Sequence, residues 1–409
     1  MKVLQVNCNG YYGSTGKIVR KLSAYLTEIG EENLIACSGY REKSTDEKTY
    51  CLSGNLTVKL NQIVSYLCGD AGFHFSLTTQ KLIRLIREQK PDVVHLHHLE
   101  SYFINVVQLA NFLRREKIPT VWTIHDCWPF TGHCTHFFSI GCDQWKTGCH
   151  DCPQKNDFPY SLFLDRSRAL YQKKRTVFSD WEDLHIVNVS NWMQEMVRQS
   201  FLDKKDMRVI YNGIDLKSFY PSETAGKYRQ KLGLEEKFVI LSVASSWSEK
   251  KGWSAFLQLA KELGVDEKIV LIGVNETQAK ELPPGILGIP KVRSVDVLRD
   301  YYSMADVYLN LSLEETFGLV SVEAMACGTP VIACNTTANP EIAAPECGVI
   351  LQEREIEQIL EALRQVRANG KPFYSEACRN RVKTHFSEAA MCEGYYQLYS
   401  EILKKRGNR

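Results

Sequence analysis

The sequence predicts an α/β fold with two doubly wound, Rossmann-like parallel sheets that face each other across a cleft. Three observations lead to it. Short apolar runs alternate with longer helical patterns throughout the 409 residues. The apolar runs are nearly continuous, which is typical of strands buried on both faces and therefore parallel. The chain is also long enough for two or three domains, and open sheets of this kind bind ligands at the carboxyl ends of their strands.

The strands fall into two series. The first is expected at residues 2–8, 33–37, 92–98, 120–126 and 184–190, and the second at 207–212, 238–243, 268–273, 306–312 and 330–334. A charged stretch at 203–206 and the Asn212-Gly213 turn separate them. We therefore expect an N-terminal domain over residues 1–205 and a C-terminal domain over 206–387. The amphipathic pattern within 388–409 predicts a helix that crosses back onto the N-terminal domain.

Composition excludes several classes of protein. The chain has 50 basic and 48 acidic residues, so no general field attracts it to nucleic acid. It shows no signal peptide at its start and no apolar run of the roughly 18 residues that a membrane span needs. Most of its 14 cysteines stand singly in apolar segments, as expected in a reducing compartment. We expect a cytoplasmic protein. Residues 51–82, with Tyr66, Leu67, Phe73 and Phe75, either contact the inner face of the plasma membrane or simply pack.

The stretch "EETFGLVSVEAMACGTPVIAC" (314–334) has two carboxylates eight positions apart. We expect a helix that starts near Phe317. If the whole span is helical, Glu315 and Glu323 lie close to one face, about 12 Å apart. Gly318 would let a phosphate approach the first turn, where unpaired N–H groups and the helix dipole favour an anion. The alternative is that Glu315 caps the helix and Glu323 is solvated. Carboxylates in a buried helix need a partner, however, which favours a functional interpretation.

This stretch strongly resembles the Glu-x7-Glu segment of the retaining glycosyltransferases of family 4, which have the GT-B fold. Three further segments resemble that family's motifs in the expected order: "NGIDLKSFYP" (212–221), "EKKGW" (249–253) and "ADVYLNLSLEETFG" (305–318). The resemblance implies transfer of a hexosyl group from a nucleotide diphosphate sugar to an acceptor hydroxyl, with retention of configuration. The acceptor would be a saccharide or a lipid-linked saccharide in surface polysaccharide or glycolipid biosynthesis.

The resemblance also implies roles for individual residues. Glu315 would bind the sugar, Glu323 the ribose, and Lys251 the leaving diphosphate. The family usually has an arginine five residues before this lysine, but Ser246 stands there. Either Lys250 or a residue from elsewhere supplies the second charge, or the diphosphate is held more weakly. The expected donor-binding residues are Gly16, Asn212, Thr316, Phe317, Gly318, Leu319 and Glu323.

In the N-terminal half, residues 10–22 form a glycine-rich loop whose spacing does not match a dinucleotide-binding fingerprint. Within it the resemblance points to Gly16. His125 and Asp126 follow a strand, and a histidine there either titrates near neutral pH or is a core residue. Family members commonly have a histidine here that touches the transferred sugar, so we take His125 as catalytic. We expect the histidines at 95, 97 and 98 to pack at the strand end.

The cysteines between residues 132 and 154 suggest a structural zinc site because they include a Cys-x2-Cys pair. Its ligands would be Cys134, Cys142, Cys149 and Cys152. Disulfides or reduced, packed thiols are the alternatives. Catalysis itself is expected to need no metal or other cofactor, because the chain has no Asp-x-Asp pair of the kind that holds Mn²⁺ against a diphosphate.

Two functions from other classes stay open. A nucleotide-sugar 2-epimerase has two similar domains but needs no acceptor. A non-catalytic nucleotide-sugar-binding protein would not need the acidic pair, so Glu315 and Glu323 argue against it.

Overall fold

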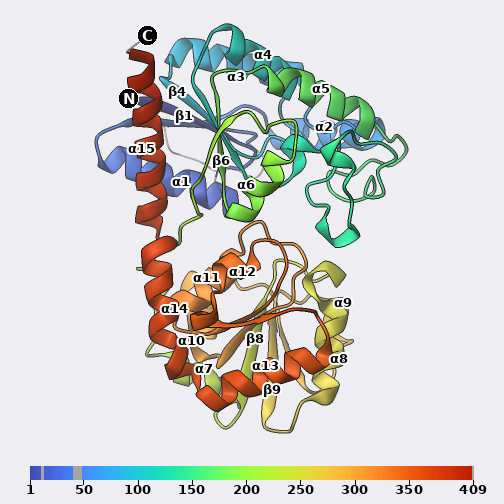
Figure 1. Cartoon of the computed structure of the whole chain (residues 1–409), viewed down its shortest axis with the longest axis vertical. Helices are drawn as coiled ribbons and strands as arrows, with labels where there is room; N and C mark the ends of the chain where they lie inside the picture. Colours follow the sequence, from blue (N-terminus) through green and yellow to red (C-terminus); the bar gives the residue numbers. More distant parts are fainter. Residues whose placement is uncertain (11–12, 40–47, 408–409) are drawn as a thin grey trace. The chain divides into compact units, whose positions relative to one another are not determined.

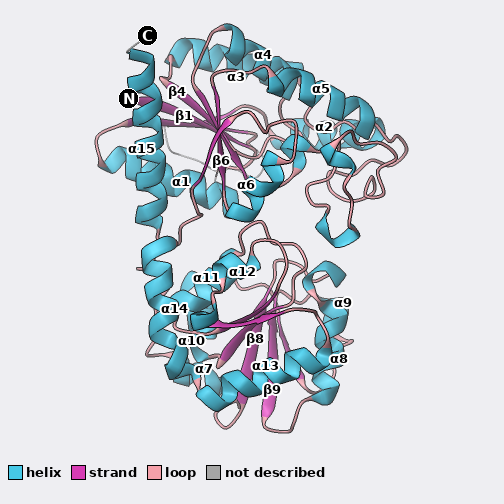
Figure 2. Cartoon of the chain, in the orientation of Figure 1, coloured by secondary structure: helices cyan, strands magenta, loops and turns pink. Residues whose placement is uncertain are grey.

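A computed structural model describes residues 1–10, 13–39 and 48–407. The chain divides into two compact units, one formed by Met1–Ile210 with Met391–Arg409 and the other by Tyr211–Ala390. Each unit has one sheet with helices on both faces (Figures 1 and 2). No helix in the described part of the chain is long and apolar enough to span a membrane.

The sheet of the N-terminal unit has seven parallel strands. In spatial order they are β3 (Thr49–Cys51), β2 (Glu32–Cys37), β1 (Lys2–Asn7), β4 (Val93–Leu96), β5 (Thr120–Ile124), β6 (Leu184–Asn188) and β7 (Asp206–Val209). The strand order reverses between β1 and β4. Ligands of open α/β sheets bind beyond the carboxyl ends of the strands at such a switch point.

Apolar residues cover both faces of this sheet. One face packs against α1 (Gly13–Glu28) and α15 (Glu388–Gly407), where Leu22 and Tyr395 are fully buried. The other packs against α3 (Ser76–Gln89), α4 (Val106–Arg115), α5 (Ser167–Ser179) and α6 (Asn191–Arg198). Burial on both faces explains the nearly continuous apolar strands in the sequence. Helix α2 (Asn55–Cys68) buries only Val58 and Ser65.

The C-terminal unit has six parallel strands. Their order is β10 (Ile286–Ile289), β9 (Glu267–Ile272), β8 (Phe238–Val243), β11 (Val307–Asn310), β12 (Val331–Cys334) and β13 (Gly348–Leu351). Its switch point therefore lies between β8 and β11. The helices are α7 (Ala225–Leu232), α8 (Trp253–Glu262), α9 (Glu276–Ala279), α10 (Val295–Met304), α11 (Leu319–Ala326), α12 (Asn339–Ile342), α13 (Ile356–Asn369) and α14 (Lys371–His385).

The prediction of two doubly wound parallel sheets is confirmed, with differences in detail. The strand expected at 207–212 is β7, which pairs with β6 and so belongs to the first sheet rather than the second. Its residues are exposed or half-buried, as expected of an edge strand, and give no sign of which sheet it joins. Strands β3, β10 and β13 were not expected; each is a short strand at the edge of its sheet.

Candidate functional site

The C-terminal unit places its candidate site at the switch point of its sheet. Lys251 lies in a short 3₁₀ helix, Glu249–Lys251, after β8, and Glu315 lies in the loop after β11. Lys251 Nζ is 2.5 Å from Glu315 Oε1 and 3.2 Å from Ser312 Oγ. Two residues that are 64 positions apart in the sequence are thus paired at neighbouring strand ends. Gly252 makes this possible, since it has φ +86° and a Cβ there would come within 2.6 Å of Leu311 Cβ.

The backbone of Glu315 is held from the loop after β12. Its N–H donates to Thr337 Oγ1 at 2.9 Å, and its carbonyl accepts from Ala338 N–H at 3.1 Å. Behind it, the buried Asn339 side chain donates to the Ser312 carbonyl and accepts from Asn310 Nδ2. The carboxylate therefore extends from a loop fixed on two sides, with its side chain only 15% exposed.

A second lysine–glutamate pair lies beside the first. Lys250 Nζ is 3.5 Å from Glu314 Oε2, and Glu314 is buried. Ser246 is exposed in the loop after β8. Lys250, one of the candidates for the second positive charge, is thus paired with a carboxylate, and its role at a diphosphate stays a prediction.

Helix α11 begins two residues later than expected. It starts at Leu319, because Gly318 has φ +87° and interrupts the helical conformation. Glu315 therefore lies outside the helix, and the expectation that one helical face carries both acids is wrong. Glu323 lies in the helix and is half-buried, and it accepts a 2.8 Å hydrogen bond from the hydroxyl of the fully buried Tyr302. Tyr302 thus supplies one of the hydrogen bonds that the Glu323 carboxylate needs, a contact that the sequence alone does not predict.

The other expected donor-binding residues occupy different environments. Phe317 is buried against Tyr211 and Phe386, so its side chain is structural and only its backbone is available to a ligand. Asn212 is buried, and its Oδ1 has no hydrogen bond in the described part of the chain. The side chains of Thr316 and Leu319 are half-buried.

Gly16, the expected donor-binding residue of the N-terminal unit, lies inside the first turn of α1 rather than in a loop. Tyr11 and Tyr12 are outside the described residues.

Histidines gather at the switch point of the N-terminal sheet. His97 Nδ1 is hydrogen bonded to His125 Nε2 at 3.1 Å, and their rings are stacked. His95 is fully buried between Thr123 Oγ1 at 2.7 Å and the Tyr399 hydroxyl at 2.6 Å. The structure thus brings His125 together with the three histidines that were expected to pack, and it supports packing for His95.

Charge separates these histidines into two kinds. Burial, followed by the positive charge of His98, lowers the pKa of His125 well below its usual range, so His125 is neutral. Burial alone would lower the pKa of His98, but the Glu100 carboxylate, a hydrogen bond with Cys8 and Asp126 raise it to about 10. His98 is therefore the positively charged histidine of this cluster, and His125 is a neutral, buried one. Burial and then Glu100 raise the pKa of Asp126 to about 6.

The cysteine loop follows β5 and is built from short 3₁₀ turns. Cys134 and Cys149 are buried, and Cys142 and Cys152 are half-buried. The Cys134 and Cys152 thiols are hydrogen bonded to each other, and Cys149 Sγ accepts from the Gly132 N–H at 3.1 Å. Among the described residues, three or more potential metal ligands lie within 4.8 Å of one another in two other groups, Cys68–Asp70–His74 and His98–Glu100–Asp126. Two of the four expected ligand thiols are thus in contact, but the four sulfur atoms do not form one group within 4.8 Å. A zinc ion at this loop stays a prediction.

Sequence reasoning missed the residues that position the site. Thr337, Asn339 and Tyr302 hold the backbone or the carboxylates of the expected residues. Glu100 and Asp126 set the charge of His98. The one available signal was position, since Asn339 and Thr337 follow directly after the apolar strand at 330–334.

Comparison with known proteins covers nearly the whole chain. The family model described as Glycosyltransferase Family 4 matches residues 15–218, and the model described as Glycosyl transferases group 1 matches residues 225–384. A putative colanic acid biosynthesis glycosyl transferase of Escherichia coli, WcaC, is 26% identical over 337 residues, which cover 78% of each chain. The N-acetyl-alpha-D-glucosaminyl L-malate synthase of Bacillus anthracis is 21% identical and covers 98% of each chain.

Solved structures show the same fold. Sucrose-phosphate synthase from Thermosynechococcus elongatus superposes with a TM-score of 0.69 at 17% identity, over 99% of each chain. Anabaena HepE in complex with UDP superposes with a TM-score of 0.67 at 15% identity, over 98% of this chain and all of that one. The matched ranges contain the pair Lys251–Glu315 and the histidine cluster. The chain is thus a glycosyltransferase of family 4 and has the GT-B fold.

Proposed function

We propose that the protein transfers a hexosyl group from a nucleotide diphosphate sugar to a hydroxyl of a saccharide or lipid-linked saccharide, with retention of configuration. Surface polysaccharide or glycolipid biosynthesis in the cytoplasm, at the inner face of the plasma membrane, is the setting we propose. The observation that carries the proposal is the Lys251–Glu315 pair, held beside the start of α11 at the switch point of the C-terminal sheet. Relatives whose names state polysaccharide or glycolipid synthesis, such as WcaC and the alpha-monoglucosyldiacylglycerol synthase of Acholeplasma laidlawii, support the setting.

The donor would bind with its diphosphate at Lys251 and at the amides of Phe317, Gly318 and Leu319. The positive end of the α11 dipole favours an anion there, and Gly318 leaves room for it to approach. Because Lys251 is paired with Glu315, an arriving diphosphate would share its ammonium group and leave Glu315 free to accept from sugar hydroxyls. Glu323 would accept from the ribose hydroxyls while keeping its bond from Tyr302.

The chemistry would be a displacement on one face of the sugar. The bond between the anomeric carbon and the diphosphate oxygen breaks, and the acceptor oxygen bonds to the same carbon from the same side. The acceptor proton passes to the departing phosphate oxygen, so no group of the protein has to act as a nucleophile or a base. Lys251 and the backbone amides would stabilise the negative charge on the leaving group, and Glu315 the positive charge at the anomeric carbon. A neutral His125 would donate to a sugar hydroxyl.

The proposal is tested in two steps. Thermal unfolding is first measured with UDP, GDP, ADP and their sugars, with and without EDTA, because a ligand of the folded state raises the midpoint. One nucleotide family that still shifts the midpoint in EDTA supports metal-independent donor binding. The product is then examined by NMR: an α-linked product from an α-linked donor supports retention, and an altered sugar without acceptor identifies an epimerase.

The same plate tests zinc. A fall of the midpoint in EDTA without nucleotide, absent when Cys149 and Cys152 are both replaced by serine, supports a structural ion at the cysteine loop. An unchanged midpoint and no zinc in the purified protein by mass spectrometry contradict it.

A further inference from the structure

Helix α2 in the N-terminal unit turns its apolar side outward. Only Val58 and Ser65 are buried, and the helix has a single charged side chain, the exposed Lys59. A helix of a globular protein normally buries its apolar stripe. The large apolar side chains of α2 that are exposed are Leu56, Leu60, Ile63, Val64 and Leu67.

A second apolar segment lies against this helix. Between Phe158 and Leu164, five large apolar or aromatic side chains are exposed: Phe158, Tyr160, Leu162, Phe163 and Leu164. The Leu162 N–H donates to the Tyr66 carbonyl of α2 at 2.9 Å, and the Tyr66 and Tyr160 rings meet edge to face at 5.5 Å. We call the exposed apolar residues of α2 and of 158–164 the apolar platform.

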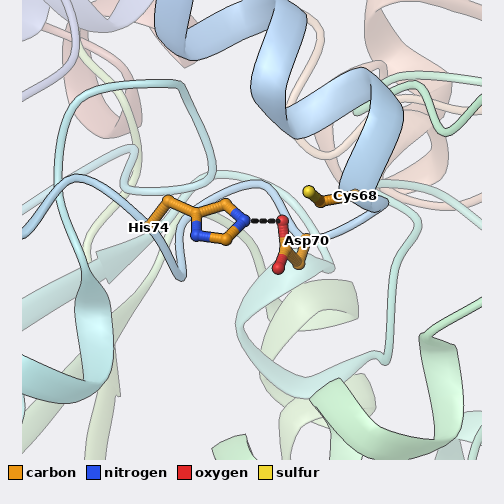
Figure 3. Close-up of side chains that lie close together, drawn as sticks. All are labelled: Cys68, Asp70 and His74. Atoms are coloured by element: carbon orange, nitrogen blue, oxygen red, sulfur yellow. Dashed lines mark ion pairs between the residues drawn. The ribbon is translucent and has the colours of Figure 1, made fainter.

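Two features fix the halves of the platform to each other. Gly69, just after α2, has φ +66°, and a Cβ there would come within 2.5 Å of the Leu164 carbonyl oxygen, so the two backbones are in close contact. The buried carboxylate of Asp70 pairs with His74 Nε2 at 2.6 Å and with Arg166 Nη1 at 3.4 Å. Figure 3 shows the His74 ring facing Asp70, with Cys68 at the end of α2 beside them. Helix α2 and residues 158–164 are therefore fixed relative to each other and form one surface.

The charges around the platform identify its partner. From Lys155 to Arg175 the sequence has six basic residues and two acidic ones, in a chain whose whole net charge is only +2. One of the six, Lys174, is fully buried and does not contribute to the surface charge. Helix α5, which follows the segment directly (Figure 1), has no acidic residue and exposes Arg168, Lys173 and Arg175. The exposed Asp157 and Asp165 flank the segment directly, and the exposed basic side chains from Arg166 onward outnumber them. An apolar surface followed along the chain by exposed basic side chains matches the boundary of an anionic bilayer, where acyl chains meet charged headgroups. An apolar patch on a partner protein would not need these basic side chains.

We propose that the apolar platform docks on an anionic phospholipid surface, with Phe163 and the leucines of α2 entering the acyl boundary and α5 facing the headgroups. The proposal rests on the proposed function in one respect, since docking would bring the N-terminal unit to a lipid-linked acceptor. Residues 51–82 were expected either to contact a membrane or to pack. Leu67 is exposed and belongs to the platform, whereas Phe73 is buried against Trp128.

Binding of the full chain to vesicles tests this without donor or acceptor. Sedimentation with phosphatidylglycerol-containing vesicles is compared with phosphatidylcholine vesicles, at low and high salt. Phe163→Ser has a matched control in Phe373→Ser, because the two phenylalanines are 70% and 69% exposed and Phe373 lies in the C-terminal unit. Leu60→Ser is a second platform variant. Arg168→Gln is paired with Arg364→Gln, an exposed arginine on α13.

We expect the wild-type chain and both control variants to bind the anionic vesicles, and salt to weaken that binding. Phe163→Ser and Leu60→Ser should each weaken it about tenfold, and Arg168→Gln about fivefold. Equal binding by Phe163→Ser and Phe373→Ser, or no binding by the wild type, overturns the proposal. Concentration-dependent dimers that Phe163→Ser abolishes, without vesicle binding, would assign the platform to a second copy. The thermal shift caused by the nucleotide donor, measured separately without vesicles, should be the same in Phe163→Ser and wild type. A shift by no nucleotide sugar in either chain would refute the proposed function and not the docking.

Discussion

Replacing Glu315 by glutamine keeps the shape of the side chain and removes the charge beside Lys251. The Lys251 side chain is 37% exposed, and partly exposed ion pairs contribute at most about 1 kcal/mol to folding. The midpoint of thermal unfolding should therefore fall by no more than about 4 °C. If Glu315 stabilises charge that develops at the anomeric carbon, kcat should fall about 10² to 10³-fold, or roughly 3–4 kcal/mol. The effect on turnover thus exceeds the effect on stability.

The assay measures kcat and KM by release of the nucleotide diphosphate, together with nucleotide affinity by calorimetry. A cycle of Glu315→Gln, Lys251→Met and the double variant follows. Residues that act on one transition state are not additive, so the double variant should be little slower than the slower single variant. Glu314→Gln is the matched control, since Glu314 pairs with Lys250 one position earlier. It should change kcat much less than Glu315→Gln.

Three results would refute this reasoning. Turnover of Glu315→Gln within a few-fold of wild type would remove Glu315 from the transition state. A loss of stability large enough to explain the lost turnover would make the pair structural. Equal losses of kcat in Glu314→Gln and Glu315→Gln would show that the site depends on the total charge of the loop and not on one carboxylate.

Three further predictions follow from the contacts. Tyr302→Phe removes the donor to Glu323, so it should lower nucleotide affinity several-fold in calorimetry and leave kcat nearly unchanged, and a change in kcat alone would contradict it. Asn339→Ala frees the loop of Glu315 and should lower kcat more than the thermal midpoint, whereas the reverse order would show a purely structural role. The pKa of His98 is raised to about 10, so its stabilisation is complete below pH 6.5 and lost as pH rises through 10. His98→Gln should therefore lower the thermal midpoint most near pH 6 and least near pH 10.5; a pH-independent difference would refute the charge assignment.

Helices and strands with a regular apolar pattern were predictable from the sequence. Contacts between side chains far apart in the chain were not. Ten strand segments stood out because they are apolar, and all of them except β7 are mostly buried. The edge strands β3, β10 and β13 are short and only partly buried, so no run of buried apolar residues marks them. The start of α11 was misplaced because Gly318 could serve either a helix or a left-handed turn, and only its φ of +87° decides.

The same distinction applies to the site. The motif at 314–334 identified Glu315 and Glu323, but not their partners, because Lys251 and Tyr302 are 64 and 21 positions away. The charge of the histidine cluster was also out of reach. Whether His98 or His125 carries the proton depends on buried carboxylates that the sequence does not place beside them.

The pair Lys251–Glu315 brings two charges of opposite sign, from two different loops, to one site. Without a donor the two side chains neutralise each other, so neither is left as an unpaired charge in a half-buried site. A diphosphate would compete for the lysine, and the glutamate would then lose a partner at the moment when sugar hydroxyls arrive. Donor binding would therefore exchange one ion pair for two ligand contacts, at little cost in net charge. On this reasoning, Lys251→Met should weaken binding of the nucleotide diphosphate more than that of the nucleoside monophosphate. Equal weakening of both would place the lysine away from the diphosphate.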